Sequence, residues 1–250
     1  MKMNATSLAA EPMPEPVKVT VDKRPLYLSI GVICAAWLYT IIRNVFFLDA
    51  VKNGFDSMPE RFAQALVVGL LALGAASLLL RLSKETFRDI GFRKDALLRQ
   101  VGIGLLFGLL IFIGGTFVTR PVTDMLVGAR SADSIDMSKL FADINTLPIW
   151  ILVSVFKGGL SEELWRSFTL TRFEKLAGKI GLIAALILTT TVFGIGHLYQ
   201  GVGGALSIAI IGLCNALVYL RKRSAIEAVT AHATFDLISI ALGFMIYTSK

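Results

Sequence analysis

The feature that most constrains this chain is a succession of apolar stretches, each of about 20 residues, which is the length that a helix needs to cross the hydrocarbon core of a bilayer. Backbone polar groups must be satisfied internally at that depth, so helices are the expected form. The stretches are residues 26–48, 62–80, 101–118, 147–168, 180–198, 202–220 and 225–247. The sequence therefore predicts an all-α, polytopic membrane helix bundle of about seven transmembrane helices.

Basic residues alternate between the two sides of this bundle, which is the pattern that sets orientation in membrane proteins. They gather before the first stretch and after the second, fourth and sixth, as Lys18, Lys23, Arg24, then residues 81–99, then Arg172, Lys175, Lys179, then Arg221, Lys222 and Arg223. We therefore expect a multi-pass protein with a cytoplasmic N-terminus. We see no organelle signal in the sequence, so the expected location is a bacterial plasma membrane. The net charge of +7 has the same origin, so the lipid bilayer is an expected partner and nucleic acid is not.

The chain divides into a short tail and one bundle. Residues 1–25 mix Pro, Glu, Lys and Thr without apolar periodicity, which predicts a disordered cytoplasmic tail. Residues 26–250 form the predicted helical bundle, and its motif-bearing core covers about residues 147–247.

Ionisable side chains stand out within the later apolar stretches. Such a group at membrane depth costs at least a few kcal/mol, so it is expected to face the bundle interior and to be functional. The groups are Glu162, Glu163 and Arg166, then His197, then His232 and Asp236. The chain has only two histidines and both belong to this set. Their occurrence on three separate helices predicts one shared polar site.

Helical spacing suggests how the first group is arranged, because residues four apart lie on the same face of an α-helix. Glu162 is then placed to pair with Arg166, which leaves Glu163 turned partly aside. A structural ion pair near the cytoplasmic boundary is the alternative reading of these residues. Gly158 and Gly159 remove side-chain bulk nearby, which permits close helix packing or a local break.

The same spacing applies to the other two groups. His232 and Asp236 should point the same way, and Phe193 should stack over His197. Taken alone, His232 could equally be a hydrogen-bonded packing residue.

These residues resemble three motifs of the CPBP family of intramembrane proteases, also called the type II CAAX prenyl endopeptidase or Abi family. The resemblance covers about residues 149–240. The family has a Glu pair followed by Arg, then Phe-x-x-x-His, then His-x-x-x-Asn or Asp, on different helices. The corresponding residues here are Glu162, Glu163, Arg166, Phe193, His197, His232 and Asp236.

The resemblance implies an intramembrane endopeptidase that acts on a peptide or protein substrate, in CAAX-type processing of prenylated proteins or in bacteriocin-type processing. The first motif departs from the family, which usually has three residues between the Glu pair and the Arg, whereas this chain has two. Alignment on the Glu pair makes Glu162 the general base. Alignment on Arg166 instead puts Ser161 at that position and leaves Glu162 as the partner of Arg166.

Peptide hydrolysis needs an activated water, a stabilised oxyanion and a proton for the leaving amine. A Glu carboxylate could activate water held between it and His197, with His232 and Asp236 opposite the scissile carbonyl. The family suggests an oxyanion site at the second His and its partner, and the simpler role for Asp236 is to orient His232. Two routes stay open: a zinc ion held by Glu162, His197 and His232, or direct activation of water by Glu and His.

Two other classes of function fit the same residues. A catalytically silent immunity or scaffold protein could keep the fold and its buried polar cluster. A small transporter could use the cluster as a path for a proton or another ion. Loss of peptide cleavage in site variants would distinguish the protease from both.

Overall fold

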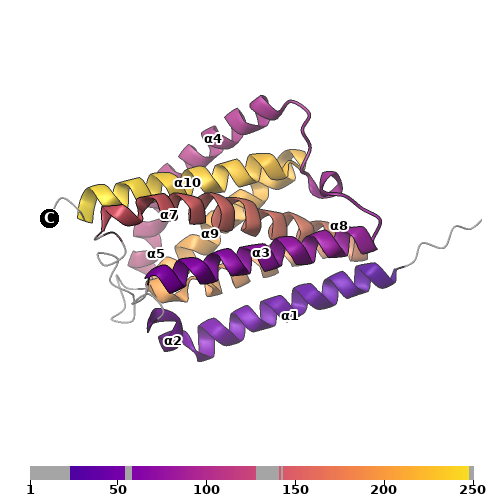
Figure 1. Cartoon of the computed structure of the whole chain (residues 1–250), viewed down its shortest axis with the longest axis horizontal. Coiled ribbons are helices and arrows are strands. Elements are labelled where there is room, and N and C mark those ends of the chain that lie inside the picture. The colour runs from indigo at the N-terminus through magenta and orange to yellow at the C-terminus, as the bar shows by residue number, and fades with distance from the viewer. Residues whose placement is uncertain (1–22, 54–57, 128–140, 142, 248–250) are drawn as a thin grey trace, which may run out of the picture.

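The computed structural model describes residues 23–53, 58–127, 141 and 143–247, and all regular secondary structure in this part of the chain is helical (Figure 1). The longer helices are α1 (Arg24–Phe46), α3 (Met58–Leu82), α4 (Leu97–Gly114), α8 (Glu163–Ile195), α9 (Gly201–Lys222) and α10 (Ala225–Tyr247). The shorter ones are α2 (Leu48–Asn53), η1 (Phe87–Ile90), η2 (Gly115–Thr119), α5 (Arg120–Val127), η3 (Ile144–Thr146), α7 (Leu147–Val153), η4 (Ser154–Glu162) and η5 (Leu198–Gln200). Residues 1–22 of the expected tail lie outside the described residues.

Six of the helical runs are long and apolar enough to cross a membrane. They are Arg24–Phe46, Pro59–Leu82, Leu97–Val127, Ile144–Ile195, Leu198–Lys222 and Ala225–Tyr247. Every apolar stretch predicted from the sequence overlaps one of them. The predicted all-α, polytopic membrane bundle is therefore confirmed, and the protein is an integral multi-pass membrane protein.

The longest run, of 52 residues, folds back on itself and so contains two of the predicted spans. Its backbone leaves helical geometry at Ala177 and Gly178, where Gly178 has a φ of 59° that suits a residue without Cβ. Beyond this break the ring of Phe193 lies 4.6 Å from the guanidinium carbon of Arg166. In a straight helix those residues would be about 40 Å apart. The fourth predicted span thus corresponds to α7, η4 and the start of α8, and the fifth corresponds to the part of α8 after the break at Gly178.

Helix α10 is the central element of the bundle. It packs along α4 on one side and along η4 on the other, and it also contacts α8 and α9 (Figure 1). Helix α1 packs against α8, and α3 packs against η4 and α8, so these two helices form the opposite side of the bundle. A residue on α10 can therefore reach η4 or α8 from one face and α4 or α9 from another.

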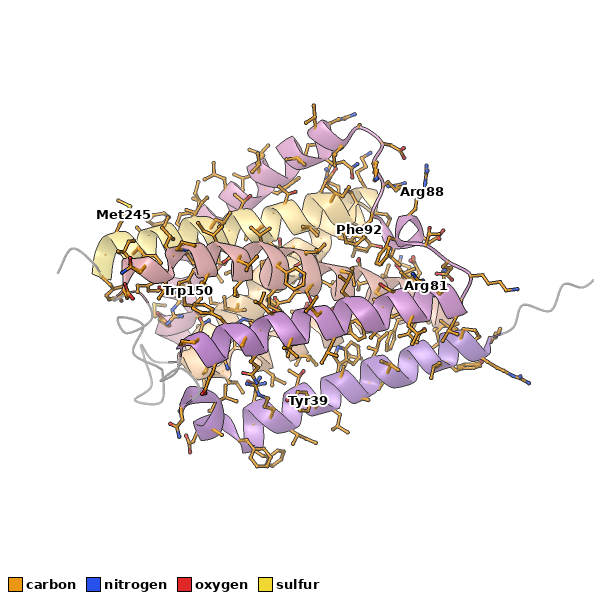
Figure 2. All side chains as sticks on the ribbon, viewed as in Figure 1. Tyr39, Arg81, Arg88, Phe92, Trp150 and Met245 are labelled. Atoms are coloured by element: carbon orange, nitrogen blue, oxygen red, sulfur yellow. The ribbon has the colours of Figure 1, made fainter. Side chains whose placement is uncertain are left out.

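Basic residues mark one end of the bundle. Arg81 and Arg88 lie there, whereas Trp150 and Met245 lie at the opposite end (Figure 2). We call the first of these the basic end. The positive-inside pattern predicts that it faces the cytoplasm.

A buried ion-pair network joins the connections at the basic end. Arg172 is 1% exposed and donates two hydrogen bonds, of 3.0 and 2.8 Å, to the Glu85 carboxylate. The Lys175 ammonium lies 2.7 Å from the same carboxylate. Arg223 forms a second bidentate pair with Glu174, with both hydrogen bonds at 2.7 Å. These pairs fix the segment after α3 and the start of α10 against α8.

Burial alone would raise the pKa of Glu85, but the hydrogen bonds from Arg172 and Lys175 outweigh it, so the pKa of this carboxyl lies below its usual value. The ionised form therefore stabilises the fold above the ordinary pKa of about 4.3. That contribution is lost as the pH falls through the lowered folded-state pKa.

We expect Glu85→Gln to lower the free energy of unfolding at pH 7 by about 3 kcal/mol, because it leaves the buried Arg172 charge uncompensated. The difference from the native protein should shrink as the pH falls below the ordinary pKa of Glu and approaches the lowered pKa of Glu85, where this carboxyl itself becomes protonated. Thermal unfolding in detergent across this pH range measures both effects. Glu60→Gln, at an exposed carboxylate of α3, is the control. Equal stability of the two variants at pH 7 would contradict the structural role of Glu85.

Candidate active site

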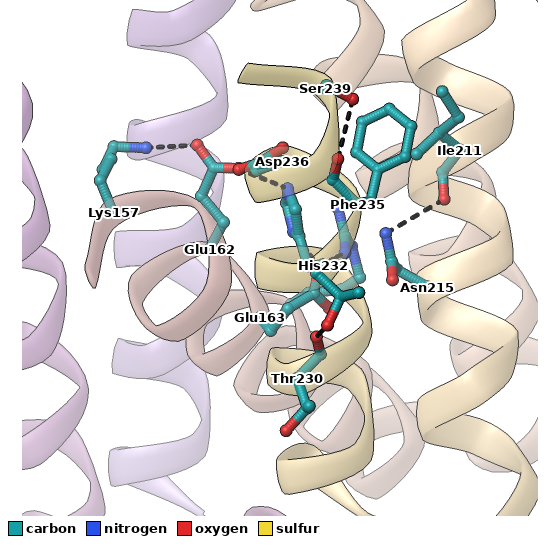
Figure 3. Close-up of polar contacts among 12 residues, drawn as sticks. Lys157, Glu162, Glu163, Ile211, Asn215, Thr230, His232, Phe235, Asp236 and Ser239 are labelled. Atoms are coloured by element: carbon teal, nitrogen blue, oxygen red, sulfur yellow. Dashed lines mark hydrogen bonds and ion pairs between the residues drawn. The ribbon is translucent and has the colours of Figure 1, made fainter. Parts of the chain in front are cut away.

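The first part of the site lies on a wide helical turn. Segment η4 is a π-helix, in which hydrogen bonds join residues five apart instead of four. Lys157 and Glu162 have this spacing, and the Lys157 ammonium forms a direct ion pair with the Glu162 carboxylate (Figure 3). In an α-helix they would point about 140° apart. The π-helix therefore brings a cation onto the face of the helix that carries Glu162.

The predicted pairing of Glu162 with Arg166 is wrong. Arg166 instead pairs with Glu163, and both side chains are buried, at 5% and 1% exposed. Helix α8 begins at Glu163, so Glu163 and Arg166 are three residues apart within its first turn and share a face. Glu162 ends the π-helix and is held by Lys157. The second carboxylate, expected to turn aside, is thus the buried one.

His232 lies among three carboxylates (Figure 3). Its Nδ1 is 2.7 Å from Glu163 Oε1, and its Nε2 is 3.8 Å from both Glu162 Oε2 and Asp236 Oδ2. An ionised carboxylate only accepts hydrogen bonds, so Nδ1 carries the hydrogen and donates a hydrogen bond to Glu163. The Nε2 atom is left facing Glu162 and Asp236. As expected from their spacing, His232 and Asp236 point the same way.

The residue that orients His232 is therefore Glu163, through a direct hydrogen bond, while Asp236 approaches the other ring nitrogen. The sequence predicts Asp236 for this role, because a carboxylate in place of Asn cannot donate a hydrogen bond to an oxyanion. The bond from Glu163 crosses between helices and has no local signature in the sequence.

Two glycines let η4 approach α10 closely. A Cβ built on Gly158 would collide with the Asp236 carboxylate. A Cβ built on Gly159 would lie 2.9 Å from the Ala233 Cβ and 3.1 Å from the Val229 carbonyl oxygen. The sequence allows either close helix packing or a local helix break at these two glycines, and the structure shows close packing. A larger residue at either position would push the carboxylates away from His232.

The Phe193 ring connects the second histidine to this cluster. Its centroid lies 4.9 Å from that of His197 and 5.9 Å from that of His232. The guanidinium of Arg166 covers the same ring at 4.6 Å. Phe193 and His197 are thus in contact as expected, although their planes are tilted by 58° and not stacked, and the Phe193 ring also contacts residues of the other two motifs.

The orientation of His197 follows from one hydrogen bond. Its Nδ1 lies 2.8 Å from the Phe193 carbonyl oxygen, which can only accept, so Nδ1 is the donor. The Nε2 atom is then the one that can exchange a proton with a substrate or water. The structure thus gathers all three predicted motifs around Phe193 and His232.

Sequence reasoning missed two polar residues of this region. Lys157 lies in the middle of the stretch 147–168, and the argument that drew attention to Glu162 applies equally to it. Asn215 of α9 is fully buried and donates a hydrogen bond to the Ile211 carbonyl at 3.4 Å, while its Oδ1 has no hydrogen-bond partner among the described residues. An Asn within an apolar stretch was the available signal for it.

The residues proposed as zinc ligands do not form a ligand set in this arrangement. Among the described residues, no three His, Cys, Asp or Glu side chains are placed to hold one metal ion. The bond between His232 Nδ1 and Glu163 leaves Nε2 as the atom of this ring that could bind an ion, 3.8 Å from the Glu162 carboxylate. The donor types would suit Zn²⁺ but their spacing here does not, so the zinc ion stays a prediction.

One family model matches the chain, over residues 143–238, and its description is type II CAAX prenyl endopeptidase Rce1-like. The matched segment runs from the residue before η3 into α10 and contains all the site residues named above. No curated protein and no solved structure matches the chain. The model that matches residues 143–238 is thus of the family that the three motifs resemble, the CPBP or type II CAAX prenyl endopeptidase family.

Proposed function

We propose that this protein is an intramembrane endopeptidase that hydrolyses a peptide bond with a water molecule activated by Glu162 and His197. The observation that carries the proposal is the convergence of two acidic residues of one helix with His232 of another, at 2.7 and 3.8 Å. The family supports CAAX-type proteolysis in general terms. The roles of individual residues below are part of the proposal.

Glu162 is the proposed general base. Its carboxylate is partly exposed, whereas that of Glu163 is buried between Arg166 and His232, so only Glu162 is free to meet a substrate. The spacing of the first motif supports the same choice. Residues three or four apart on a helix share a face, so Glu163 can pair with Arg166 even though only two residues separate the Glu pair from the Arg. Alignment on the Glu pair therefore leaves Glu162 as the base and Glu163 as the partner of Arg166, so Ser161 does not have to occupy the position of the base.

In the proposed reaction Glu162 removes a proton from water as the water oxygen attacks the scissile carbonyl carbon. His197 holds the water through its Nε2 atom. The same proton then passes to the leaving amine when the carbon–nitrogen bond breaks. The other proton of the water stays on the new carboxyl group, so the two products are a carboxylic acid and an amine.

The oxyanion would be stabilised by His232. With Nδ1 bonded to Glu163, a protonated ring presents its Nε2 proton to the developing negative charge. Glu163 and Asp236 both lie beside the ring and compensate its positive charge. Asp236 also lies where the family has Asn or Asp, on the side of the ring that would meet the substrate.

The substrate would be a membrane-associated peptide or protein. The site is formed by helices that span the bilayer, so a substrate must be presented to it at that depth. A prenylated C-terminal peptide and a bacteriocin-type leader are the two substrate classes that we propose. A panel containing both kinds of peptide would identify which one is cleaved.

We expect Glu162→Gln and His197→Ala each to reduce peptide cleavage by about 100-fold or more, since each removes a group that handles the reacting water. Purified variants in detergent, incubated with the peptide panel and analysed by mass spectrometry, provide the measurement. Glu174→Gln, which changes a carboxylate at the basic end, is the matched control. Undiminished cleavage in both site variants would sink the proposed mechanism, and solute flux in proteoliposomes without cleavage would favour a transporter.

A separate expectation concerns Lys157, which lies outside the three motifs. Lys157→Met should lower kcat by about tenfold to 100-fold, because the Glu162 carboxylate then loses its paired cation at membrane depth. KM should change little, and Lys157→Arg should recover part of the rate because it keeps the charge. Lys175→Met, which breaks a Lys–Glu pair at the basic end, is the control. Equal kcat values for Lys157→Met and Lys175→Met would show that Lys157 plays no part.

The choice between direct and metal-assisted activation can be tested with a chelator. We expect cleavage to persist after treatment with 1,10-phenanthroline, because among the described residues no three His, Cys, Asp or Glu side chains are placed to hold one ion. Metal content of the purified protein would be measured in parallel. Activity that is lost with the chelator and restored by Zn²⁺ would replace direct activation with the zinc route.

A further inference from the structure

A groove of about 500 Å³ lies between α4 and α9, on the outside of the bundle. Its walls are apolar and include Phe107 and Ile111 of α4 and Leu217 of α9. Its floor is a cluster of Ile111, Ile211 and Val218 that packs against Phe235 of α10. One charged side chain, Arg221, lines it. The groove is therefore mainly apolar and carries one positively charged side chain, that of Arg221.

The groove is separate from the proposed active site. Phe235 and Ile211 lie on the opposite side of α10 from Lys157 and Glu162 (Figure 3). Helix α10 therefore stands between the groove and the acidic cluster. Whatever occupies the groove does not take the place of the scissile peptide.

The length of the groove matches half of a bilayer. Along α9 it extends from Ile210 to Arg221, three helical turns that span about 16 Å. One leaflet of the hydrocarbon core is about 15 Å thick. Beyond this stretch Asp124 and Arg120 of α5 lie against Gly203 and Gly204 of α9 and close the space between the helices. A transmembrane helix of a partner protein would need about 30 Å, which this groove does not provide.

Arg221 places a positive charge where a lipid headgroup would lie. It is the last residue but one of α9, at the basic end of the bundle, and its side chain is 37% exposed. An ion pair with the buried Glu227 and a contact of 5.2 Å with the Phe107 ring hold the guanidinium beside the groove. The neighbouring Lys222 is exposed as well. This end of the groove is therefore complementary to an anion.

We propose that the groove binds one acyl chain of an anionic phospholipid from the leaflet at the basic end, with the lipid phosphate at Arg221. Apolar walls exclude water, so hydrocarbon is the material that fills such a space at this depth. The length selects a chain that crosses one leaflet, and the cation selects an anionic headgroup. This site is independent of the proposed proteolytic reaction.

Two glycines of α4 supply a matched pair of variants. A Cβ built on Gly114, which lines the groove, meets no atom within 4 Å, and neither does one built on Gly102 of the same helix. A leucine can therefore be introduced at either position without a clash at its Cβ. Gly114→Leu places its side chain in the groove, whereas Gly102 is not among the lining residues.

The test uses the full-length protein in nanodiscs that contain phosphatidylglycerol with a photoreactive group in one acyl chain. We expect crosslinks in α9 near Cys214 and Leu217, located by mass spectrometry, and at least a fivefold loss of them in Gly114→Leu. Gly102→Leu should label like the native protein. Phosphatidylcholine with the same chains should label less than phosphatidylglycerol, and Arg221→Gln should remove that difference.

Several results would overturn the assignment. Equal labelling of Gly114→Leu and Gly102→Leu would show that the chain does not enter the groove. Equal labelling by the two lipids would show that the headgroup is not recognised at Arg221. Displacement of the label by a prenylated peptide but not by unlabelled phosphatidylglycerol would assign the groove to a substrate chain instead. None of these readouts requires peptide cleavage, so they remain informative if the protein is not a protease.

Discussion

The rest of the site depends on the two hydrogen bonds that the buried Glu163 carboxylate accepts. It accepts from Arg166 on its own helix and from His232 on α10, so one side chain fixes two motifs relative to each other. An uncompensated charge in this interior would cost several kcal/mol. The close contact of η4 with α10 and the cover of Arg166 by Phe193 follow from the same need to keep these charges paired.

Much of the fold could be predicted from apolar length alone, because the bilayer admits few alternatives to a spanning helix. The stretches 147–168 and 180–198 correctly fall on opposite sides of the break at Gly178, within one helical run of 52 residues. The composition of the site was also readable, since Glu162 and His232 are ionisable groups that lipid does not tolerate. Both inferences rest on the cost of polarity in hydrocarbon and need no knowledge of packing.

The pairings within the site could not be predicted in the same way. They were inferred from α-helical spacing, whereas η4 is a π-helix, and one extra residue per hydrogen-bonded turn changes which side chains share a face. Glu162 consequently meets Lys157 and not Arg166. The bond from Glu163 to His232 joins residues far apart in the chain, and only the packing of α8 against α10 creates it.

The two ion pairs of the first motif region are each formed within a single segment, Lys157 with Glu162 and Glu163 with Arg166. Helices α9 and α10 follow later in the chain, so they are made after this segment during synthesis. Each of these four charged side chains therefore has a partner before His232 is synthesised. The segment can enter the bilayer as two neutral pairs, and the arrival of α10 then converts one of them into a three-residue network.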